Sequence, residues 1–299
     1  MRKYILFILL LSGCRSEIPY FSGNNAYQYL LQQCRFGPRD PGSKGHQLTS
    51  DFIMEQLAGA DTVFKQPFTY LSDKSGKLYN LNNIIARYVP QSEKQILISA
   101  HWDTRPWSDR DPDPEKRNLP TLGANDGASG VAVLLELAQI FNNNPPPFGV
   151  NLIFWDGEDL GTAGDNWSYA RGSQYFAQNL PFDRPDYGIN LDMVGDSDLA
   201  LYIERISFQQ NPGLVRDLWN LAKQLNLTGF RMEARYAVFD DHVPLFEMGG
   251  IPAIDIIDFE YPNAYENYWH TQKDLPQYCS AQSLWQVGSL LIHHIYGEK

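Results

Sequence analysis

An apolar run that ends in closely spaced acids is the feature that most constrains this chain. The segment VNLIFWD reads as a buried β-strand whose last residue is Asp156, and Glu158 and Asp159 follow at once. Three like charges repel, and removing them from water is costly unless a cation or protons compensate. The next residues, LGTAGD, favour a loop, so the acids are expected at the carboxyl end of a strand. In open α/β sheets, sites are built at that edge.

The order of apolar segments predicts the fold class. From residue 127 onward, helical patterns such as GASGVAVLLELAQIFNN alternate with short apolar strands, and no linker-like stretch divides the 299 residues. We therefore expect a single α/β domain with a mixed, mostly parallel central sheet flanked by helices on both faces. Earlier, FKQPFTYL, LYNLNNIIARYV and KQILISAHWD lie close together, which predicts antiparallel hairpins at the start of the sheet.

Two helices are expected before the first strand. They surround a Gly/Pro-rich turn, with Asn25 as the candidate cap of the first and an amphipathic period from about His46 to Leu57 in the second. The formal net charge of −11 argues against a nucleic-acid partner, because no basic stripe is present to release counterions from phosphates.

The amino terminus has the pattern of a targeting segment. Two cations precede an apolar run, Tyr4 to Leu11, that is too short to span a bilayer, and LSGC follows. LSGC resembles the lipobox of bacterial lipoproteins, which implies cleavage before Cys14 and acylation of that cysteine; the alternative is an ordinary signal peptide. We expect a signal peptide at 1–13, an anchor and linker at 14–23 and the folded domain at 24–299. The expected location is the bacterial periplasm, tethered to the outer membrane.

Two cysteines remain after the expected cleavage. Cys34 and Cys279 lie near opposite ends of the domain. In an oxidising envelope they are able to pair, and the alternative is two small, buried, apolar side chains. The sequence leaves both readings open.

Polar residues follow several of the expected strands or begin a helix. They are His101, Asp103, Asp126, Glu158, Asp159, Asp192 and His270. Imidazole and carboxylate ligands together suit Zn²⁺, which in catalytic sites takes three protein ligands and keeps one open position. The GED segment then supplies one metal ligand and, beside it, one acid that is free for proton transfer.

Each of these residues also has a structural explanation. His101 and His270 are each compatible with an ordinary hydrogen-bonded histidine at a strand end. Asp126 is placed to cap the helix that follows it, and Asp192 to end a strand. Asp103 is suited to orient a neighbouring imidazole. Their co-occurrence at matching places in the fold favours a site.

The order of these motifs resembles a known group. The succession of HWD, GANDGASG, the acidic pair, Asp192 and His270 is similar to the zinc-dependent aminopeptidase superfamily. Within it, DGED, FDDHVPLF (239–246) and YWHT (268–271) resemble the glutaminyl-peptide cyclotransferases, or glutaminyl cyclases. CRFGPRDPGSKGH and GSQYFA are similar to the bacterial branch. The resemblance covers about residues 25–295.

The resemblance implies an activity and a set of roles. The activity is conversion of the N-terminal glutamine of peptides or proteins to pyroglutamate, with release of ammonia. One zinc ion would be held by Asp126, Asp159 and His270. Glu158 would be the general acid/base, with Asp192 and Asp240 in a short hydrogen-bond network around it. Asp159 departs from the glutamate of the animal enzymes and is one methylene shorter.

The resemblance also implies an aromatic pocket. Trp269 matches the family's pocket tryptophan, while Tyr265, Phe239 and Trp167 are substrate-binding candidates that are equally suited to the core or the rim. Ala100 stands where a cysteine beside the animal active site would be, so that disulfide is absent. The long, charged segment 105–121 is expected to be either a lid or a loop without a role at the metal. We expect a monomer.

Two other functions compete with this interpretation. In a two-zinc aminopeptidase, which hydrolyses N-terminal residues, Asp126 would bridge two metals and Glu158 would activate water. The full ligand set for that enzyme is also present: His101, Asp126, Asp159, Asp192 and His270. A non-enzymatic lipoprotein that keeps the fold as a binding module would be expected to have lost at least one ligand, and none is missing.

Overall fold

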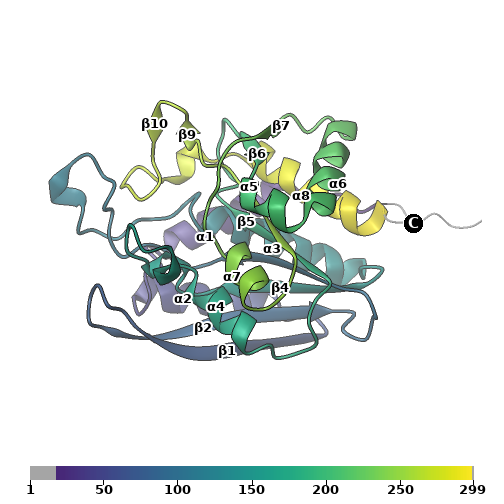
Figure 1. Ribbon diagram of the computed structural model, residues 1–299, viewed down its shortest axis with the longest axis horizontal. Helices are drawn as coiled ribbons and strands as arrows, with labels where there is room; N and C mark the ends of the chain where they lie inside the picture. Colours follow the sequence, from purple (N-terminus) through teal and green to yellow (C-terminus); the bar gives the residue numbers. More distant parts are fainter. Residues whose placement is uncertain (1–17, 298–299) are drawn as a thin grey trace, which may run out of the picture.

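A six-stranded sheet runs through the protein (Figure 1). The structure is a computed structural model, which describes residues 18–297. Its strands, in spatial order, are β1 (Thr62–Leu71), β2 (Leu78–Tyr88), β4 (Gly149–Trp155), β3 (Gln95–His101), β5 (Tyr187–Asp192) and β8 (Ala253–Ile257). The pairs β1–β2 and β2–β4 are antiparallel, and the pairs among β4, β3, β5 and β8 are parallel. The predicted single α/β domain with a mixed, mostly parallel sheet is confirmed.

The third strand departs from the expected hairpins. β1 and β2 form the predicted hairpin, with Leu71 opposite Leu78, but β3 pairs with β4 and β5 in parallel. Every residue of β3 is buried. A strand that is covered on both faces reads as a continuous apolar run and belongs in the parallel centre of a sheet, not at its antiparallel edge.

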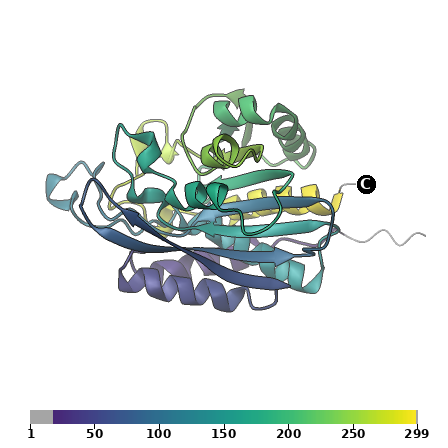
Figure 2. The same ribbon diagram turned by 60° about the horizontal axis from the view of Figure 1, so that its bottom comes forward.

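Helices cover both faces of this sheet. One face is covered by α1 (Gly23–Arg35), α2 (Lys44–Gln56), α3 (Ala128–Asn143) and α8 (Ala281–Gly297), and the other by α4 (Arg171–Gln178), α5 (Arg205–Gln210) and α7 (His242–Glu247). In Figure 2 the purple helices α1 and α2 lie beneath the sheet and the green helices lie above it. Consecutive side chains of β3 serve the two cores, because Ile96 and Ile98 face α3 while Leu97 packs with Trp155 and Phe176.

The remaining elements are short or peripheral. A small parallel pair, β6 (Leu201–Ile203) and β7 (Phe230–Ala234), packs with α6 (Pro212–Gln224), and β9 (Pro262–Asn263) pairs with β10 (Glu266–Asn267). Four 3₁₀ helices complete the described part of the chain: η1 (Pro114–Lys116), η2 (Glu158–Leu160), η3 (Asn166–Ser168) and η4 (Pro276–Tyr278). Among residues 18–297, no helix has the length and apolar character needed to cross a membrane.

The amino-terminal predictions have mixed outcomes. The cap of α1 is Ser22, whose Oγ accepts from the backbone N–H of Asn25, so the assignment of Asn25 as the cap is wrong. A hydroxyl placed three residues before that N–H satisfies one of the free donors of the first turn. Cys34 and Cys279 are both free thiols. The predicted signal peptide and anchor residue Cys14 lie outside the described residues.

Candidate metal and catalytic site

The parallel strands bring the predicted polar residues to one edge of the sheet. His101 ends β3 and pairs in register with Trp155, the last residue of β4, after which η2 carries Glu158 and Asp159. Asp192 ends β5 in the same direction. Because neighbouring parallel strands end at the same edge, side chains from distant parts of the sequence converge there.

Three of these residues form a group suited to a metal ion. Asp126, Asp159 and His270 are all buried, and each offers a donor atom within 4.8 Å of the others. His270 Nε2 lies 3.0 Å from Asp159 Oδ1 and 3.7 Å from Asp126 Oδ2. Asp126 Oδ2 and Asp159 Oδ2 are buried without a hydrogen-bond partner among the described residues. Two carboxylates and one imidazole with free, buried oxygens fit a zinc ion.

A second group shares one of those ligands. His101 Nε2 lies 3.1 Å from Asp126 Oδ1 and 3.3 Å from Asp192 Oδ1, and the three residues also meet the 4.8 Å criterion. Asp126 therefore faces both groups with different oxygens. The arrangement accommodates one ion or two.

Backbone geometry supports this convergence. His270 has a φ of 58°, in the left-handed region that non-glycine residues rarely adopt and that is concentrated at functional sites. Gly127, at the start of α3, has a φ of 94°, and a Cβ there would lie 2.8 Å from the Asp103 carbonyl oxygen. Only glycine allows the helix to begin this close to β3. Gly127 is also the N-cap, so the alternative role of Asp126 as a helix cap is wrong.

Glu158 stands beside the three-residue group and lines the same cavity. Burial raises the pKa of its carboxyl well above the usual value, and the charge of Asp159 adds to the rise. The turn that holds it is fixed by Asp103, whose two carboxylate oxygens accept from the backbone N–H groups of Glu158 and Asp159 at 3.1 and 3.2 Å. Asp103 Oδ1 also lies 3.6 Å from His101 Nδ1, an ion-pair distance, and that nitrogen has no hydrogen-bond partner among the described residues.

Asp192 and Asp240 line the cavity with Glu158. Asp240 Oδ2 accepts from Asn190 Nδ2 at 2.9 Å. Burial and the charge of Asp192 raise the pKa of Asp240 to about 6. Among residues 18–297 no hydrogen bond joins the Glu158 side chain to either acid, so the expected hydrogen-bond network is not formed. The charge of Asp240 raises the pKa of Glu158.

The charges of the three-residue group are unbalanced. Burial and the charge of Asp159 raise the pKa of Asp126 well above its usual value. Burial alone would also raise the pKa of Asp159, but His270 and Arg105 outweigh it and the pKa is lowered. The same site therefore holds one carboxylate that favours ionisation and one that favours a proton. A cation that displaced the proton would relieve this conflict.

The cavity above these residues has a volume of about 260 Å³ and several aromatic walls. Trp269, Phe239, Phe259, Tyr169 and Tyr236 line it, and the Trp269 ring stacks on the His270 ring with centroids 3.7 Å apart. A concave, partly apolar pocket with converging polar groups is the usual form of a small-ligand site.

Two predicted pocket residues do not line this cavity. Trp167 is 43% exposed and packs edge-on against Phe239, one of the residues that line the cavity. Tyr265 is 97% exposed, because it sits at the turn between β9 and β10. The structure brings Trp269 and Phe239 to the cavity but not these two side chains.

Comparison with known proteins identifies the family. Residues 83–295 match Peptidase family M28, well over half of the chain. This chain is an M28 family member. It is similar to the structure of Bacteroides thetaiotaomicron glutaminyl cyclase bound to N-acetylhistamine, with 35% identity, a TM-score of 0.90, and 95% of this chain and 100% of that chain covered. It is equally similar to a Zn-dependent exopeptidase from Parabacteroides distasonis, with 34% identity, a TM-score of 0.90, and 94% and 100% covered.

A curated relative supports the same grouping. The Drosophila melanogaster glutaminyl-peptide cyclotransferase is 27% identical over 276 residues, which cover 79% of this chain and 70% of that protein. The predicted resemblance to bacterial glutaminyl cyclases, within a zinc aminopeptidase-like fold, is confirmed. The family and these neighbours support a zinc cofactor in the M28 chain.

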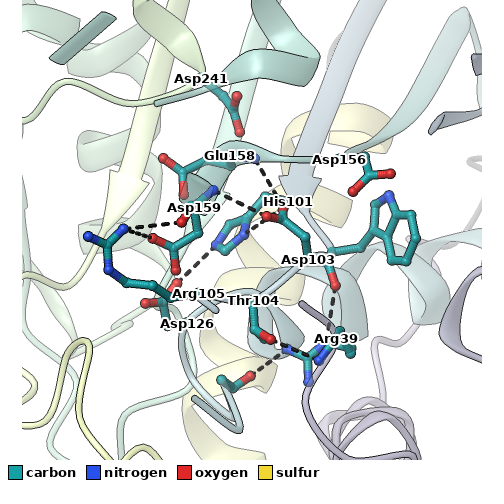
Figure 3. Close-up of polar contacts among 12 residues, drawn as sticks. Arg39, His101, Asp103, Thr104, Arg105, Asp126, Asp156, Glu158, Asp159 and Asp241 are labelled. Atoms are coloured by element: carbon teal, nitrogen blue, oxygen red, sulfur yellow. Dashed lines mark hydrogen bonds and ion pairs between the residues drawn. The ribbon is translucent and has the colours of Figure 1, made fainter. Parts of the chain in front are cut away.

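The first acid of the opening segment has a different task from the other two. Asp156 Oδ1 lies 2.9 Å from His46 Nε2, and its other oxygen accepts from the Asn82 backbone N–H. The His46 ring stacks on Trp102. Asp156 therefore ties α2 to the sheet, and in Figure 3 it lies apart from the carboxylates of the site.

Sequence reasoning missed three residues that support this M28 site. Asp274, four residues after His270, accepts from the backbone N–H groups of Asn125 and Asp126 and so holds the Asp126 turn. Arg105 and Asp109, in the loop after β3, contact two of the candidate ligands. An acidic residue close behind YWHT could have indicated a role for Asp274 at the site. The sequence around Arg105 did not indicate where its side chain points.

Proposed function

We propose that this M28 protein is a glutaminyl-peptide cyclotransferase, a zinc-dependent acyltransferase that converts N-terminal glutamine to pyroglutamate. The observation that carries the proposal is Trp269, which forms a wall of the cavity directly beside His270. An aromatic wall there suits a folded glutamine side chain and excludes water from the reacting carbonyl. The similarity to bacterial glutaminyl cyclases supports the same reading.

The substrate groups have natural places in this cavity. The glutamine side chain would pack against Trp269, with its γ-carbonyl toward Asp126, Asp159 and His270. Zinc bound by those three residues would supply Lewis-acid polarisation of that carbonyl. The free α-amine of the peptide would lie on the Glu158 side of the cavity.

Glu158 carries the proton through the reaction. Its carboxylate takes a proton from the α-amino nitrogen as that nitrogen forms a bond to the carbonyl carbon of the side-chain amide, Cδ. It then gives the proton to the γ-amide nitrogen as the carbon–nitrogen bond breaks and ammonia leaves. A group that serves both steps needs a pKa near the working pH, and the raised pKa of Glu158 is in the required direction. The charge of Asp240 contributes to this rise, so Asp240 influences the proton on Glu158.

A two-zinc aminopeptidase is the second candidate, and one observation favours it. The group formed by His101, Asp126 and Asp192 offers a second set of metal donors beside the first. Glu158 would then take a proton from water as the water oxygen forms a bond to the peptide carbonyl carbon. It would return that proton to the amide nitrogen as the carbon–nitrogen bond breaks and the amine leaves. The similar exopeptidase structure is consistent with that chemistry.

A paired assay distinguishes the two functions. The purified protein, without its amino-terminal segment, is given a Gln-initiated peptide in one tube and a Leu-initiated peptide in another, and its zinc content is measured. Loss of ammonia detected by mass spectrometry, with about one zinc per chain and sensitivity to a chelator, supports the cyclase. Release of free leucine with about two zincs per chain overturns it in favour of the aminopeptidase.

Glu158→Gln tests the acid/base assignment. Turnover should fall by at least about a hundredfold while zinc content and fold are retained. Glu136→Gln is the matched control, because Glu136 is also a buried glutamate but contacts Ser22 and Asn25 on the α1 side. Near-normal turnover by Glu158→Gln would show that the assignment is wrong.

We also propose a lipid anchor at Cys14 that tethers the protein in the periplasm. The support is the order of basic flank, short apolar run and LSGC in the sequence. Incorporation of labelled palmitate into the wild type but not into Cys14→Ser is expected. Equal labelling of both proteins, or of neither, would contradict it.

A further inference from the structure

The loop after β3 reaches into the candidate site through a buried arginine. Arg105 is fully buried, and its Nε and Nη2 donate to the two carboxylate oxygens of Asp109 at 2.8 and 2.7 Å. Its Nη1 donates to Asp159 twice, to the backbone carbonyl and to Oδ1, both at 3.1 Å. Figure 3 shows the guanidinium directed at Asp159. One planar group thus binds both the backbone carbonyl and the carboxylate of a short ligand residue.

The partner of Arg105 lies next to another candidate ligand. Asp109 Oδ1 is 3.6 Å from His270 Nδ1, an ion-pair distance. The loop is held there independently, because the Arg110 backbone N–H donates to the His270 carbonyl and Gln272 Nε2 donates to Ser108 Oγ. Through these contacts, Arg105 and Asp109 touch two ligands that come from distant segments of the chain.

The contacts select particular ligand atoms. Asp159 Oδ1 is engaged by Arg105, which leaves Oδ2 buried and without a hydrogen-bond partner among residues 18–297. On the imidazole, Asp109 faces Nδ1, whereas Nε2 faces Asp126 and Asp159. Metal-bound histidines usually have a carboxylate or carbonyl at the second ring nitrogen, which fixes the tautomer and the ring orientation.

We propose that Arg105 and Asp109 are a positioning pair that presents Asp159 Oδ2 and His270 Nε2 to the zinc ion. This inference rests on the ligand assignment of the proposed function. It gives the 105–121 segment a role at the metal, which neither of the two expectations from the sequence included. The Arg105 guanidinium also suits Asp159 better than a longer glutamate, because it binds the backbone carbonyl and Oδ1 of the same short residue.

Zinc affinity of the metal-free protein tests the pair without relying on turnover. Apo wild type, Arg105→Lys and Asp109→Asn are each titrated with zinc against a chromophoric chelator. Loss of a residue that orients a ligand is expected to weaken zinc binding by about 10- to 100-fold. The visible spectrum of the cobalt-substituted variants should also differ from that of the wild type, because the ligand geometry changes.

Two matched controls come from the same loop. Arg117 donates to the Asp111 carbonyl, and half-buried Asp113 pairs with Lys116, so neither side chain contacts a ligand. Arg117→Lys and Asp113→Asn should bind zinc as the wild type does. Apo melting temperatures of all variants separate a loss of metal from a loss of fold. If Arg105→Lys does not fold, Asp109→Asn decides, because it leaves the contacts of Arg105 with Asp159 in place.

Asp159→Asn and His270→Ala separate the two possible failures. If these variants bind zinc as tightly as the wild type, the ligand assignment is wrong. If they lose zinc while folded Arg105→Lys and Asp109→Asn keep wild-type affinity and cobalt spectrum, the ligands stand and the positioning pair is overturned. Weakened binding and an altered spectrum in the two loop variants, with unchanged controls, support the pair.

Discussion

A cavity group and a buried group of histidine and carboxylate side chains lie near each other in this protein, and of these two only the cavity group is suited to function as a metal site. The cavity group is Asp126, Asp159 and His270, and the buried group is Asp240, His242 and Asp255. Each places donor atoms within 4.8 Å of one another. All three members of the cavity group line the 260 Å³ pocket, whereas only Asp240 of the buried group does so. His242 and Asp255 are completely buried.

The two groups also differ in how their charge is balanced. His242 Nε2 lies 3.3 Å from Glu204, whose carboxylate accepts from the backbone N–H groups of Ile206, Ser207 and Val238. Burial raises the pKa of Asp255 well above its usual value, and the charge of Asp240 adds to the rise, so Asp255 favours a proton. Both groups contain a buried carboxylate oxygen without a hydrogen-bond partner among residues 18–297, but only in the cavity group do all three members line a pocket. Donor identity and an unpaired oxygen therefore do not by themselves make a metal site; access from a cavity is also required.

The largest expected contrast is between the histidines of the two groups. His270→Ala should lose zinc, and its turnover rate should fall by at least about a hundredfold, because the substitution removes a ligand. His242→Ala should keep zinc when folded but lose about 3–5 kcal/mol of unfolding free energy, since it leaves the buried Glu204 charge unpaired. Zinc analysis and denaturant unfolding measure the two effects.

The control for this contrast is His293→Ala, which removes a half-buried histidine of α8 far from both groups. It should change neither zinc content nor turnover. Loss of zinc from folded His242→Ala would mean that the buried group holds metal and that the distinction between the groups is wrong.

Unfolding at low pH should test whether His242 compensates the charge of Glu204 in the buried group. Burial raises the pKa of Glu204, but the hydrogen bond and charge of His242 outweigh it and lower the pKa from 4.5 to about 2. An acid with a lowered pKa stabilises the fold fully above its usual value, and this contribution is lost as the pH falls from about 4.5 towards 2. The shift corresponds to at most about 3 kcal/mol. The stability advantage of the wild type over Glu204→Gln should therefore shrink between pH 5 and pH 3 in denaturant unfolding. A difference that stays constant over this range would contradict the assignment.

Much of this arrangement was predictable from the sequence, and the rest depended on packing. Strands that end in polar residues indicate the edge of the sheet at which the site is built, so the convergence of Asp126, Asp159 and His270 followed from topology. The parallel placement of β3 was missed because short spacing favours hairpins, and its complete burial appears only in the folded sheet. Asp156 resembled its neighbours in sequence but faces His46, because it continues the alternation of β4 and points to the sheet face opposite that of Trp155. The contact of Arg105 with Asp159 was not predictable, because hydrophobic periodicity does not determine the path of a long loop.

The smallest expected effect is a difference in KM between a variant of the cavity wall and a variant of the nearby surface. Trp269 lines the cavity and stacks on His270, and Arg110 covers its ring with the guanidinium carbon 4.7 Å from the centroid. Trp269→Ala should raise KM for a Gln-initiated peptide by about tenfold or more, the factor expected when a large apolar contact is lost.

Tyr265 is only a few residues away and almost fully exposed. Tyr265→Ala should leave KM within about twofold of the wild type and stability within about 0.5 kcal/mol, because a surface substitution without contacts changes little. Steady-state kinetics of the two variants under identical conditions makes the comparison. A larger rise in KM for Tyr265→Ala than for Trp269→Ala would place substrate binding on the β9–β10 turn, outside the cavity. Equal KM values for Trp269→Ala and the wild type would remove the observation on which the choice of a cyclase over an aminopeptidase rests.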